Sequence, residues 1–323
     1  MFKIIGTGMH IPKNLVTNES LYGKFGPDLK KIYERIGHGA RYYCDQGESS
    51  ADLAVKAGEE ALKNSGLKTG DIDLLIISTD TPAQISPATA AEVQHRLGLK
   101  NSAAFDINCA CAGFVTAMDI AVKYLDGKNY RNVMIIGTYA MSKHVDHDDM
   151  GSVMLFGDGA GAFILQHAPK QGRIASTLKA DGVYWDYMGI YSGGTRRPVN
   201  EEVLADRTHK VKIPKKFPAS LNREEWPPLI KRTLDKLSMK PEAVDAFVFT
   251  QVRKPTIEEV MQEFGQPMSK THTIMEKWGY TGSACIPMAF HDMAAQGKVK
   301  RGDRVVLCAS GGGYAMACLT FVY

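Results

Sequence analysis

Two cysteines in the stretch FDINCACAGF, Cys109 and Cys111, are the residues whose type and spacing point most directly to covalent chemistry. A cysteine thiolate is a strong nucleophile and a metal ligand, whereas a buried thiol packs as a small apolar group. The chain has six cysteines but no CxxC pair, which argues against a zinc knuckle or a thioredoxin-like redox motif. Whether these two cysteines are reactive depends on the elements that position them.

The segment after Cys111 has the apolar spacing of a helix. Apolar residues recur at positions 114, 115, 118, 121, 122 and 125, and Gly127 marks the expected end. Cys111 then lies at or just before a helix N-terminus, where free N–H groups and the positive dipole end lower the pKa of a thiol. This placement favours Cys111 as the reactive thiol and Cys109 as a packing residue. The alternative is that both cysteines only fill a tight strand-to-helix turn.

An internal repeat predicts the architecture. The segments ALKNSGLKTGDIDLLIISTD and TLDKLSMKPEAVDAFVFTQV both run from a helical pattern through a turn into a buried strand. The offset between them is constant, because 234 − 62 and 250 − 78 both equal 172. The same offset pairs Cys111 with Ser283. We therefore expect two α/β halves, with near-continuous apolar strands in sheets covered on both faces.

Residues 185–228 separate the two halves and are predicted to be an irregular connection. Prolines at positions 198, 214, 218, 227 and 228 favour a linker over a core element. Ligands in duplicated folds of this kind gather where the two halves meet, so Cys111 and Ser283 are both expected near that junction.

Composition excludes several classes of function. The net charge of +4 is too small to indicate nucleic acid binding, and no apolar run approaches the length of a membrane span. The first residues, MFKIIGTGMHIPKN, indicate a strand and not a signal peptide. Together with the unpaired cysteine spacing, these features predict a cytoplasmic protein with reduced thiols.

The motifs taken together resemble the β-ketoacyl-acyl-carrier-protein synthase III family of the thiolase superfamily. The matching segments are IIGTGMHIP, DINCACAGF, FGDGAGAFIL, KWGYTGSACIPMAF and ASGGGYAM. The resemblance implies an α/β thiolase fold, with duplicated βαβαβ halves in a five-layer α-β-α-β-α sandwich. It places the halves at residues 1–170 and 171–323, and it implies a homodimer. Cys111 matches the acyl-accepting nucleophile, and Gly312 matches the glycine whose N–H completes an oxyanion hole with the N–H of Cys111.

The resemblance also identifies two departures from the family pattern. Gln251 stands where the family has a catalytic histidine, and Tyr280 stands where it has an asparagine. A shift of one position would still find no histidine, because residues 245–260 contain none. Gln251 and Tyr280 can donate hydrogen bonds but cannot shuttle a proton near neutral pH. We therefore expect acyl capture by Cys111 but consider malonyl decarboxylation doubtful.

Family members that use acyl-coenzyme A hold its adenine between a tryptophan and an arginine, and the matching positions here are Lys31 and Met150. No stacking clamp is evident, so we expect an acyl-carrier protein as the donor in preference to coenzyme A, with no cofactor beyond the thioester. Carrier proteins are acidic and need a basic docking surface. The candidate docking residues are Lys210, Lys212, Lys215 and Lys216, with a solvated loop as the alternative.

Three further motifs have competing interpretations. Residues 144–149, HVDHDD, could suggest a metal site, but the family has none there and no metal is expected. His272 is predicted to lie packed on a strand. Ile85 lies where family dimers meet, so it is either a determinant of acyl chain length or an ordinary core residue.

The leading hypothesis is an atypical synthase III-like acyltransferase or condensing enzyme that carries an acyl group on Cys111. The expected setting is fatty-acid-related or specialised lipid or secondary-metabolite biosynthesis. The rival is a non-catalytic subunit that binds an acyl carrier or pairs with an active paralogue in a heterodimer. A third possibility is an ordinary ketosynthase whose decarboxylation uses different donors.

Overall fold

The computed structural model describes residues 2–127, 129–168 and 174–323. In the first half of the chain, five strands form a mixed sheet in the order β1-β7-β6-β4-β5. The strands are β1 (Phe2–His10), β4 (Leu74–Ser78), β5 (Ala103–Ile107), β6 (Asn132–Tyr139) and β7 (Gly159–His167). Parallel pairing joins β4 to β5 and β6, while β7 runs antiparallel to both of its neighbours. Every residue of β4 and β6 is buried, as expected for strands covered on both faces.

The second half repeats this plan with a four-stranded sheet in the order β8-β11-β10-β9. Its strands are β8 (Ala175–Ala180), β9 (Ala246–Phe249), β10 (Arg304–Gly311) and β11 (Ala315–Val322). Strands β9 and β10 are parallel, and β11 is antiparallel to β10 and β8. At the free edge of β9, where the first sheet has β5, a single bridge pairs Phe247 with Thr271.

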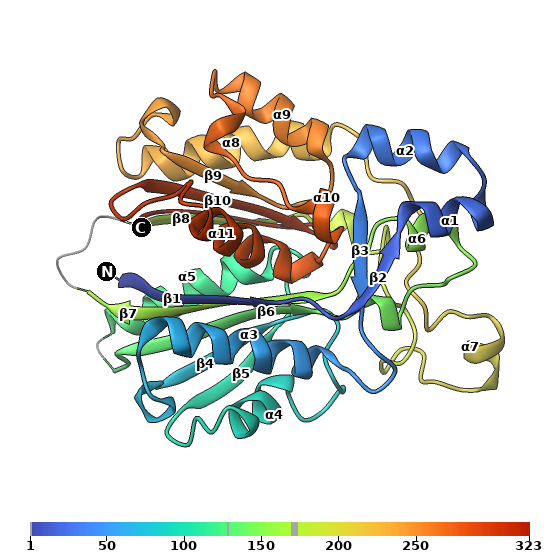
Figure 1. The fold of residues 1–323 in the computed structure, drawn as a ribbon, viewed down its shortest axis with the longest axis horizontal. Helices are drawn as coiled ribbons and strands as arrows, with labels where there is room; N and C mark the ends of the chain where they lie inside the picture. The colour runs from blue at the N-terminus through green and yellow to red at the C-terminus, as the bar shows by residue number, and fades with distance from the viewer. Residues whose placement is uncertain (1, 128, 169–173) are drawn as a thin grey trace.

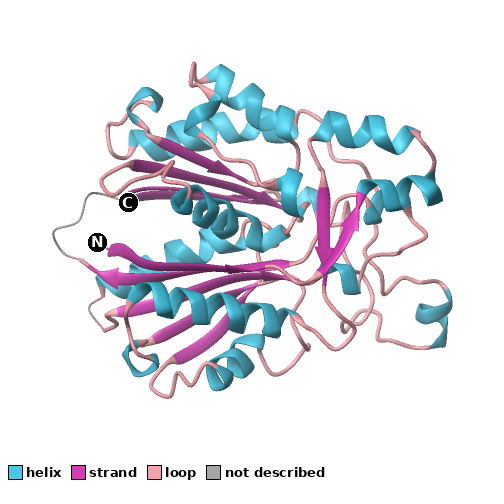
Figure 2. Cartoon of the chain, viewed as in Figure 1, coloured by secondary structure: helices cyan, strands magenta, loops and turns pink. Residues whose placement is uncertain are grey.

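Helices form three layers around the two sheets (Figure 1). The central layer contains α5 (Gly113–Asp126) and α11 (Cys285–Ala295), which pack between the sheets. The outer layers contain α3 (Ser50–Ser65) and α4 (Thr89–Arg96) on the first sheet, and α8 (Leu221–Asp235) and α9 (Lys254–Glu263) on the second. Figure 2 shows the resulting alternation of helices and strands. The five-layer α/β sandwich expected from the sequence is confirmed.

The 172-residue offset is retained in the structure. Strands β6 and β10 begin at residues 132 and 304, and helices α5 and α11 begin at 113 and 285. The carboxylates at the repeat positions make the same contact: Asp73 accepts the N–H of Asn132 and Asp245 accepts that of Arg304, both at 2.9 Å. The N-termini of α5 and α11 therefore meet at the junction of the two halves.

Smaller elements flank the sandwich at one end (Figure 1). They are β2 (Asn14–Thr17), β3 (Ala40–Tyr43), α1 (Asn18–Phe25), α2 (Asp28–Ile36), α6 (Met150–Val153), α7 (Glu201–Ala205) and α10 (Met275–Trp278). Strands β2 and β3 pair with each other in an antiparallel ladder. The predicted boundary between residues 170 and 171 lies outside the described residues.

The prediction that residues 185–228 are irregular is wrong at α7, which lies within them, and at their C-terminal end. Helix α8 begins at Leu221 and includes Pro227 and Pro228. A proline inside a helix removes one backbone hydrogen bond, but this helix buries Trp226, and the Trp226 ring stacks on Phe249 with a centroid distance of 5.4 Å. Tertiary burial therefore outweighs the local preference of proline. Among the described residues, we find no helix with the length and apolar character needed to cross a membrane.

Candidate active site

Cys111 lies in a tight turn between the end of β5 and the start of α5. The turn is closed by hydrogen bonds from the N–H of Ala112 to the carbonyl of Cys109, at 3.1 Å, and from the N–H of Gly113 to the carbonyl of Ala110, at 3.0 Å. Ala110 has a φ of 45°, in the left-handed region that costs a non-glycine residue about 1–2 kcal/mol. The sequence prediction that Cys111 lies just before a helix N-terminus is confirmed. Cys109 is only partly buried, and it does not line the cavity described below.

A glycine turn after β10 faces Cys111 from the second half of the chain. A Cβ atom on Gly311 would lie 2.6 Å from the backbone nitrogen of Cys111, so only glycine permits this close approach. Within the described residues, the N–H groups of Cys111 and Gly312 donate to no other residue. Cys111 and Gly312 also line one cavity, so their two free N–H groups are candidates for an oxyanion hole, and that role stays a prediction.

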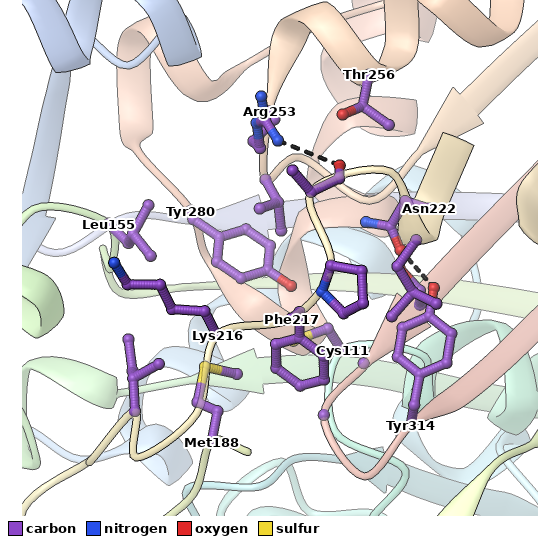
Figure 3. A pocket seen from close by; sticks show the side chains of 18 of the residues that line it. Cys111, Leu155, Met188, Lys216, Phe217, Asn222, Arg253, Thr256, Tyr280 and Tyr314 are labelled. Atoms are coloured by element: carbon purple, nitrogen blue, oxygen red, sulfur yellow. Dashed lines mark hydrogen bonds between the residues drawn. The ribbon is translucent and has the colours of Figure 1, made fainter. Parts of the chain in front are cut away.

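Cys111 opens into a cavity of about 370 Å³ between the halves. Most of the lining is apolar, with side chains such as Leu155, Met188 and Phe217 (Figure 3). The charged lining residues are Lys216 and Arg253, and no histidine or acidic residue is among them. An apolar cavity of this size can hold an acyl chain or the arm of a thioester.

Tyr280 is brought to the thiol by the backbone that precedes α11. Its N–H donates to the carbonyl of Leu155 at 3.0 Å, and its carbonyl accepts the N–H of Gly157 at 2.9 Å. The Tyr280 side chain is buried and lines the same cavity as Cys111, close enough for its hydroxyl to lower the pKa of the thiol. The placement of Tyr280 beside the nucleophile therefore agrees with the sequence prediction.

The pKa of Cys111 does not follow the sequence prediction. Burial raises the pKa of this thiol well above its usual value, and the nearby negative charge of Asp80 raises it further. The hydrogen bond from Tyr280 lowers the pKa but does not reverse the effect of burial. The expected fall of the thiol pKa at the helix start is therefore wrong for the protein without substrate, because the Cys111 side chain is buried.

Gln251 does not reach the cavity. Its Nε2 donates to the carbonyls of Phe249 and His272 at 2.9 and 3.2 Å, and its Oε1 accepts the N–H of Ile274 at 2.9 Å. The side chain is fully buried, and both its NH₂ group and its oxygen are bonded to backbone groups. The prediction that Gln251 takes the place of the catalytic histidine is therefore corrected: Gln251 holds the segment after α9 against the end of β9.

The strand alternation of β9 identifies a different residue at this position. Val248 packs into the core that contains Cys111, whereas Phe247 and Phe249 pack into the outer core with Trp226. Because side chains alternate along a strand, Thr250 is on the same side as Val248. The Oγ1 of Thr250 accepts the N–H of Ser310 at 2.9 Å, and Ser310 lines the cavity.

Two polar residues near the thiol were not found from the sequence. Asn222 lines the cavity, and its Oδ1 accepts a hydrogen bond from Ser310 Oγ at 2.9 Å and another from the Tyr314 hydroxyl. Asp80 follows β4, and its Oδ1 is sealed from water without a hydrogen-bond partner. Asp80 lies in the segment TDTP, residues 79–82, and nothing in the spacing of that segment indicated a buried carboxylate.

Three of the predicted substrate-binding residues do not line this cavity. Lys31 is exposed on α2 and forms an ion pair with Asp28 at 3.2 Å. Met150 is the first residue of α6 and is exposed. Ile85 is 84% exposed, so its alternative role as a core residue is wrong, while its predicted place at a dimer interface stays a prediction.

The four predicted docking lysines differ in their surroundings. Lys210 donates to the carbonyl of Lys143 at 3.1 Å, Lys212 pairs with Asp146 at 3.3 Å, and Lys215 pairs with Asp186 at 2.6 Å. Lys216 is exposed at the cavity and has no acidic partner among the described residues. Among the described residues, Lys210 and Lys216 therefore have no carboxylate partner, and of these two only Lys216 lines the cavity.

The HVDHDD segment uses its carboxylates internally. Asp146 and Asp148 both pair with Arg207, at 3.1 and 2.8 Å, and Asp149 caps the N-terminus of α6. No group of three potential metal-ligating side chains occurs among the residues that the structure describes. His272 is packed as expected, with its Nε2 2.7 Å from Asp292 Oδ2, but it lies in a loop and not on a strand.

Comparison with known proteins identifies the family. Residues 105–182 match the family described as 3-oxoacyl-[acyl-carrier-protein (ACP)] synthase III, and residues 234–323 match its C-terminal family. The chain is 33% identical over 322 residues to the β-ketoacyl-[acyl-carrier-protein] synthase III of Aquifex aeolicus, with 99% of each chain covered. It is 32% identical over 313 residues to that of Methylococcus capsulatus, with 97% of this chain and 96% of the relative covered.

A solved structure supports the same assignment. The 3-oxoacyl-[acyl-carrier-protein] synthase III of Aquifex aeolicus superposes with a TM-score of 0.90 at 31% identity, and each chain is covered completely. The sequence similarity and the shared fold both extend across the two halves of the chain. The protein therefore belongs to the 3-oxoacyl-[acyl-carrier-protein] synthase III family.

Proposed function

We propose that this protein is an atypical acyltransferase or condensing enzyme that takes an acyl group from an acyl-carrier protein onto Cys111. The observation that carries the proposal is the thiol of Cys111 in an apolar cavity, with the free N–H groups of Cys111 and Gly312 beside it. The relatives are named for synthesis on an acyl-carrier protein, which supports a carrier-bound thioester as the donor.

The first step is transthioesterification. The Cys111 sulfur attacks the thioester carbonyl carbon, and the carbonyl oxygen becomes an oxyanion that accepts hydrogen bonds from the N–H groups of Cys111 and Gly312. Collapse of this intermediate breaks the bond to the carrier sulfur, which takes up the proton that the Cys111 thiol gave. Two helix N-termini, those of α5 and α11, stabilise the negative charge as it develops.

The second step distinguishes this protein from the usual pattern of the family. In our proposal Tyr280 stands in place of the family's asparagine, and Thr250 stands in place of its histidine, because Gln251 does not reach the cavity. The cavity lining contains no group that exchanges a proton near neutral pH, which supports an acceptor that needs no malonyl decarboxylation, or one that decarboxylates slowly. Specialised lipid or secondary-metabolite biosynthesis suits such a reaction.

The rival function is a non-catalytic subunit that binds an acyl carrier or joins an active paralogue. The raised pKa of Cys111 favours this rival, because a protonated thiol is a poor nucleophile. The free N–H groups of Cys111 and Gly312 favour the enzyme, since a binding subunit has no use for an oxyanion hole.

A single-turnover assay separates the two functions. The protein is mixed with an excess of carrier protein that bears an acyl thioester, and the release of free carrier thiol is followed with a thiol reagent. The enzyme predicts a burst of one equivalent per chain, followed by turnover when a carrier-bound acceptor is added, and no burst for Cys111→Ala. Absence of a burst with every acyl chain length would favour the subunit.

A further inference from the structure

Asn222 is a polar residue on the cavity wall that the proposed mechanism does not yet use. It lies at the second position of α8, and its Oδ1 accepts hydrogen bonds from the hydroxyls of Ser310 and Tyr314. Ser310 and Tyr314 flank the glycine turn that carries Gly312. The amide of Asn222 is therefore tied directly to the backbone that forms the oxyanion hole.

The two hydroxyls fix the orientation of this amide. A carbonyl oxygen only accepts hydrogen bonds, and both hydroxyls donate to it, so the opposite end of the side chain must be the NH₂ group. In Figure 3 the Asn222 nitrogen points away from Tyr314 and into the cavity. Nδ2 has no hydrogen-bond partner within the described part of the chain. The cavity wall thus presents a fixed donor without an acceptor.

The position of this donor complements that of Tyr280. Figure 3 shows the two side chains entering the cavity from opposite sides, with Cys111 between them. The N–H groups of Cys111 and Gly312 already serve the carbonyl of the acyl donor. A carbonyl oxygen of the second substrate needs other donors, and among the polar side chains that line the cavity the Tyr280 hydroxyl and the Asn222 amide lie on either side of Cys111 (Figure 3).

We propose that Asn222 is a substrate-contacting residue whose Nδ2 donates a hydrogen bond to the thioester carbonyl oxygen of the acceptor. The inference rests on the proposed function and names the acceptor class as a carbonyl-bearing thioester. Tyr280 and Asn222 together would then supply the two donors that hold this carbonyl, and Ser310 and Tyr314 position Asn222 without touching the substrate.

The test uses two ligands that cannot react. One is an acyl-pantetheine analogue with a ketone in which CH₂ replaces the thioester sulfur, and the other is the same molecule with the carbonyl reduced to CH₂. Dissociation constants are measured by calorimetry for the wild type and for Asn222→Asp, which keeps the shape and both hydroxyl contacts but has no NH₂ group. The matched control is Asn64→Asp, which changes an asparagine on α3 that lies outside the cavity.

The inference predicts that Asn222→Asp weakens binding of the ketone about tenfold relative to the carbonyl-free analogue, the size of one lost hydrogen bond. Asn64→Asp should leave the dissociation constants of both analogues unchanged. Tyr314→Phe, which frees the amide to rotate, should give a smaller loss of about two- to threefold. Equal losses for the two analogues would overturn the inference and leave acyl capture by Cys111 intact. Failure of the wild type to bind the ketone at all would overturn the thioester site itself.

Discussion

Replacing Asp80 by asparagine should stabilise the protein at neutral and alkaline pH. Burial raises the pKa of Asp80 from 3.8 to about 6, and its Oδ1 has no hydrogen-bond partner. Below the pKa of the unfolded state, the carboxyl is protonated in both the folded and the unfolded state, so its burial does not reduce the free energy of unfolding. As pH rises through the window from 3.8 to about 6, the unfolded chain loses its proton first, so the folded state becomes less stable. Above this window the full penalty is present, about 2–3 kcal/mol for a shift of this size.

The assay is thermal or urea unfolding of the wild type and Asp80→Asn at several pH values. We expect the two proteins to be about equally stable at roughly pH 3, below the unfolded pKa, and the variant to gain about 2–3 kcal/mol by pH 8. Asp148→Asn is the control of opposite sign, because pairing with Lys24 and Arg207 lowers the pKa of Asp148 to about 2. Asp148→Asn should be less stable than the wild type at pH values above the unfolded pKa of the carboxyl. This difference in stability should vanish as pH falls toward 2.

The same substitution should also make Cys111 more reactive. The negative charge of Asp80 raises the pKa of the thiol, so its removal increases the thiolate fraction at a given pH. Alkylation by iodoacetamide, followed by mass spectrometry, should therefore be faster in Asp80→Asn. Unchanged stability together with unchanged alkylation would refute the reasoning, since both follow from an uncompensated charge beside the thiol.

Three further outcomes follow from the site geometry. Gly311→Ala should slow acyl capture at least about a hundredfold. The added Cβ would lie 2.6 Å from the nitrogen of Cys111 and would displace the proposed oxyanion hole. A normal burst of carrier thiol would contradict this. Tyr280→Phe should slow alkylation and acyl capture about tenfold through loss of the hydroxyl that stabilises the thiolate, and an equal or faster rate would show that the hydroxyl is not needed. Lys216→Glu should raise the KM for an acidic carrier protein several-fold at low salt. Lys215→Glu should raise it less, because Lys215 is already paired with Asp186. Equal increases for the two variants would argue against Lys216 as the docking contact.

The sequence was most informative where a periodic pattern recurred. The 172-residue offset predicted the paired strands and helices because each half must bury the same faces, and the structure retains the offset at β6, β10, α5 and α11. The helix after Cys111 was predicted from its apolar spacing alone. The failure at Pro227 and Pro228 has a different cause, since local propensity cannot reveal that the neighbouring Trp226 is buried against Phe249.

The side-chain environment of the site was harder to predict. Gln251 was assigned to the cavity from its neighbours in sequence, but strand alternation directs Thr250 to that side and leaves Gln251 to bind backbone groups. Asn222 comes from a segment with no motif, and only the fold brings it to Ser310 and Tyr314. The rise in the pKa of Cys111 depends on burial, which a sequence pattern at a helix start does not contain.

Intact-mass spectrometry after incubation with acyl-carrier-protein and acyl-coenzyme A thioesters tests the central claim most directly. Cys111→Ala and Cys109→Ala are measured in parallel. The account predicts the mass gain of one acyl group per chain from carrier-bound donors, retained in Cys109→Ala and lost in Cys111→Ala. A gain that persists in Cys111→Ala, or no gain with any donor, would contradict it.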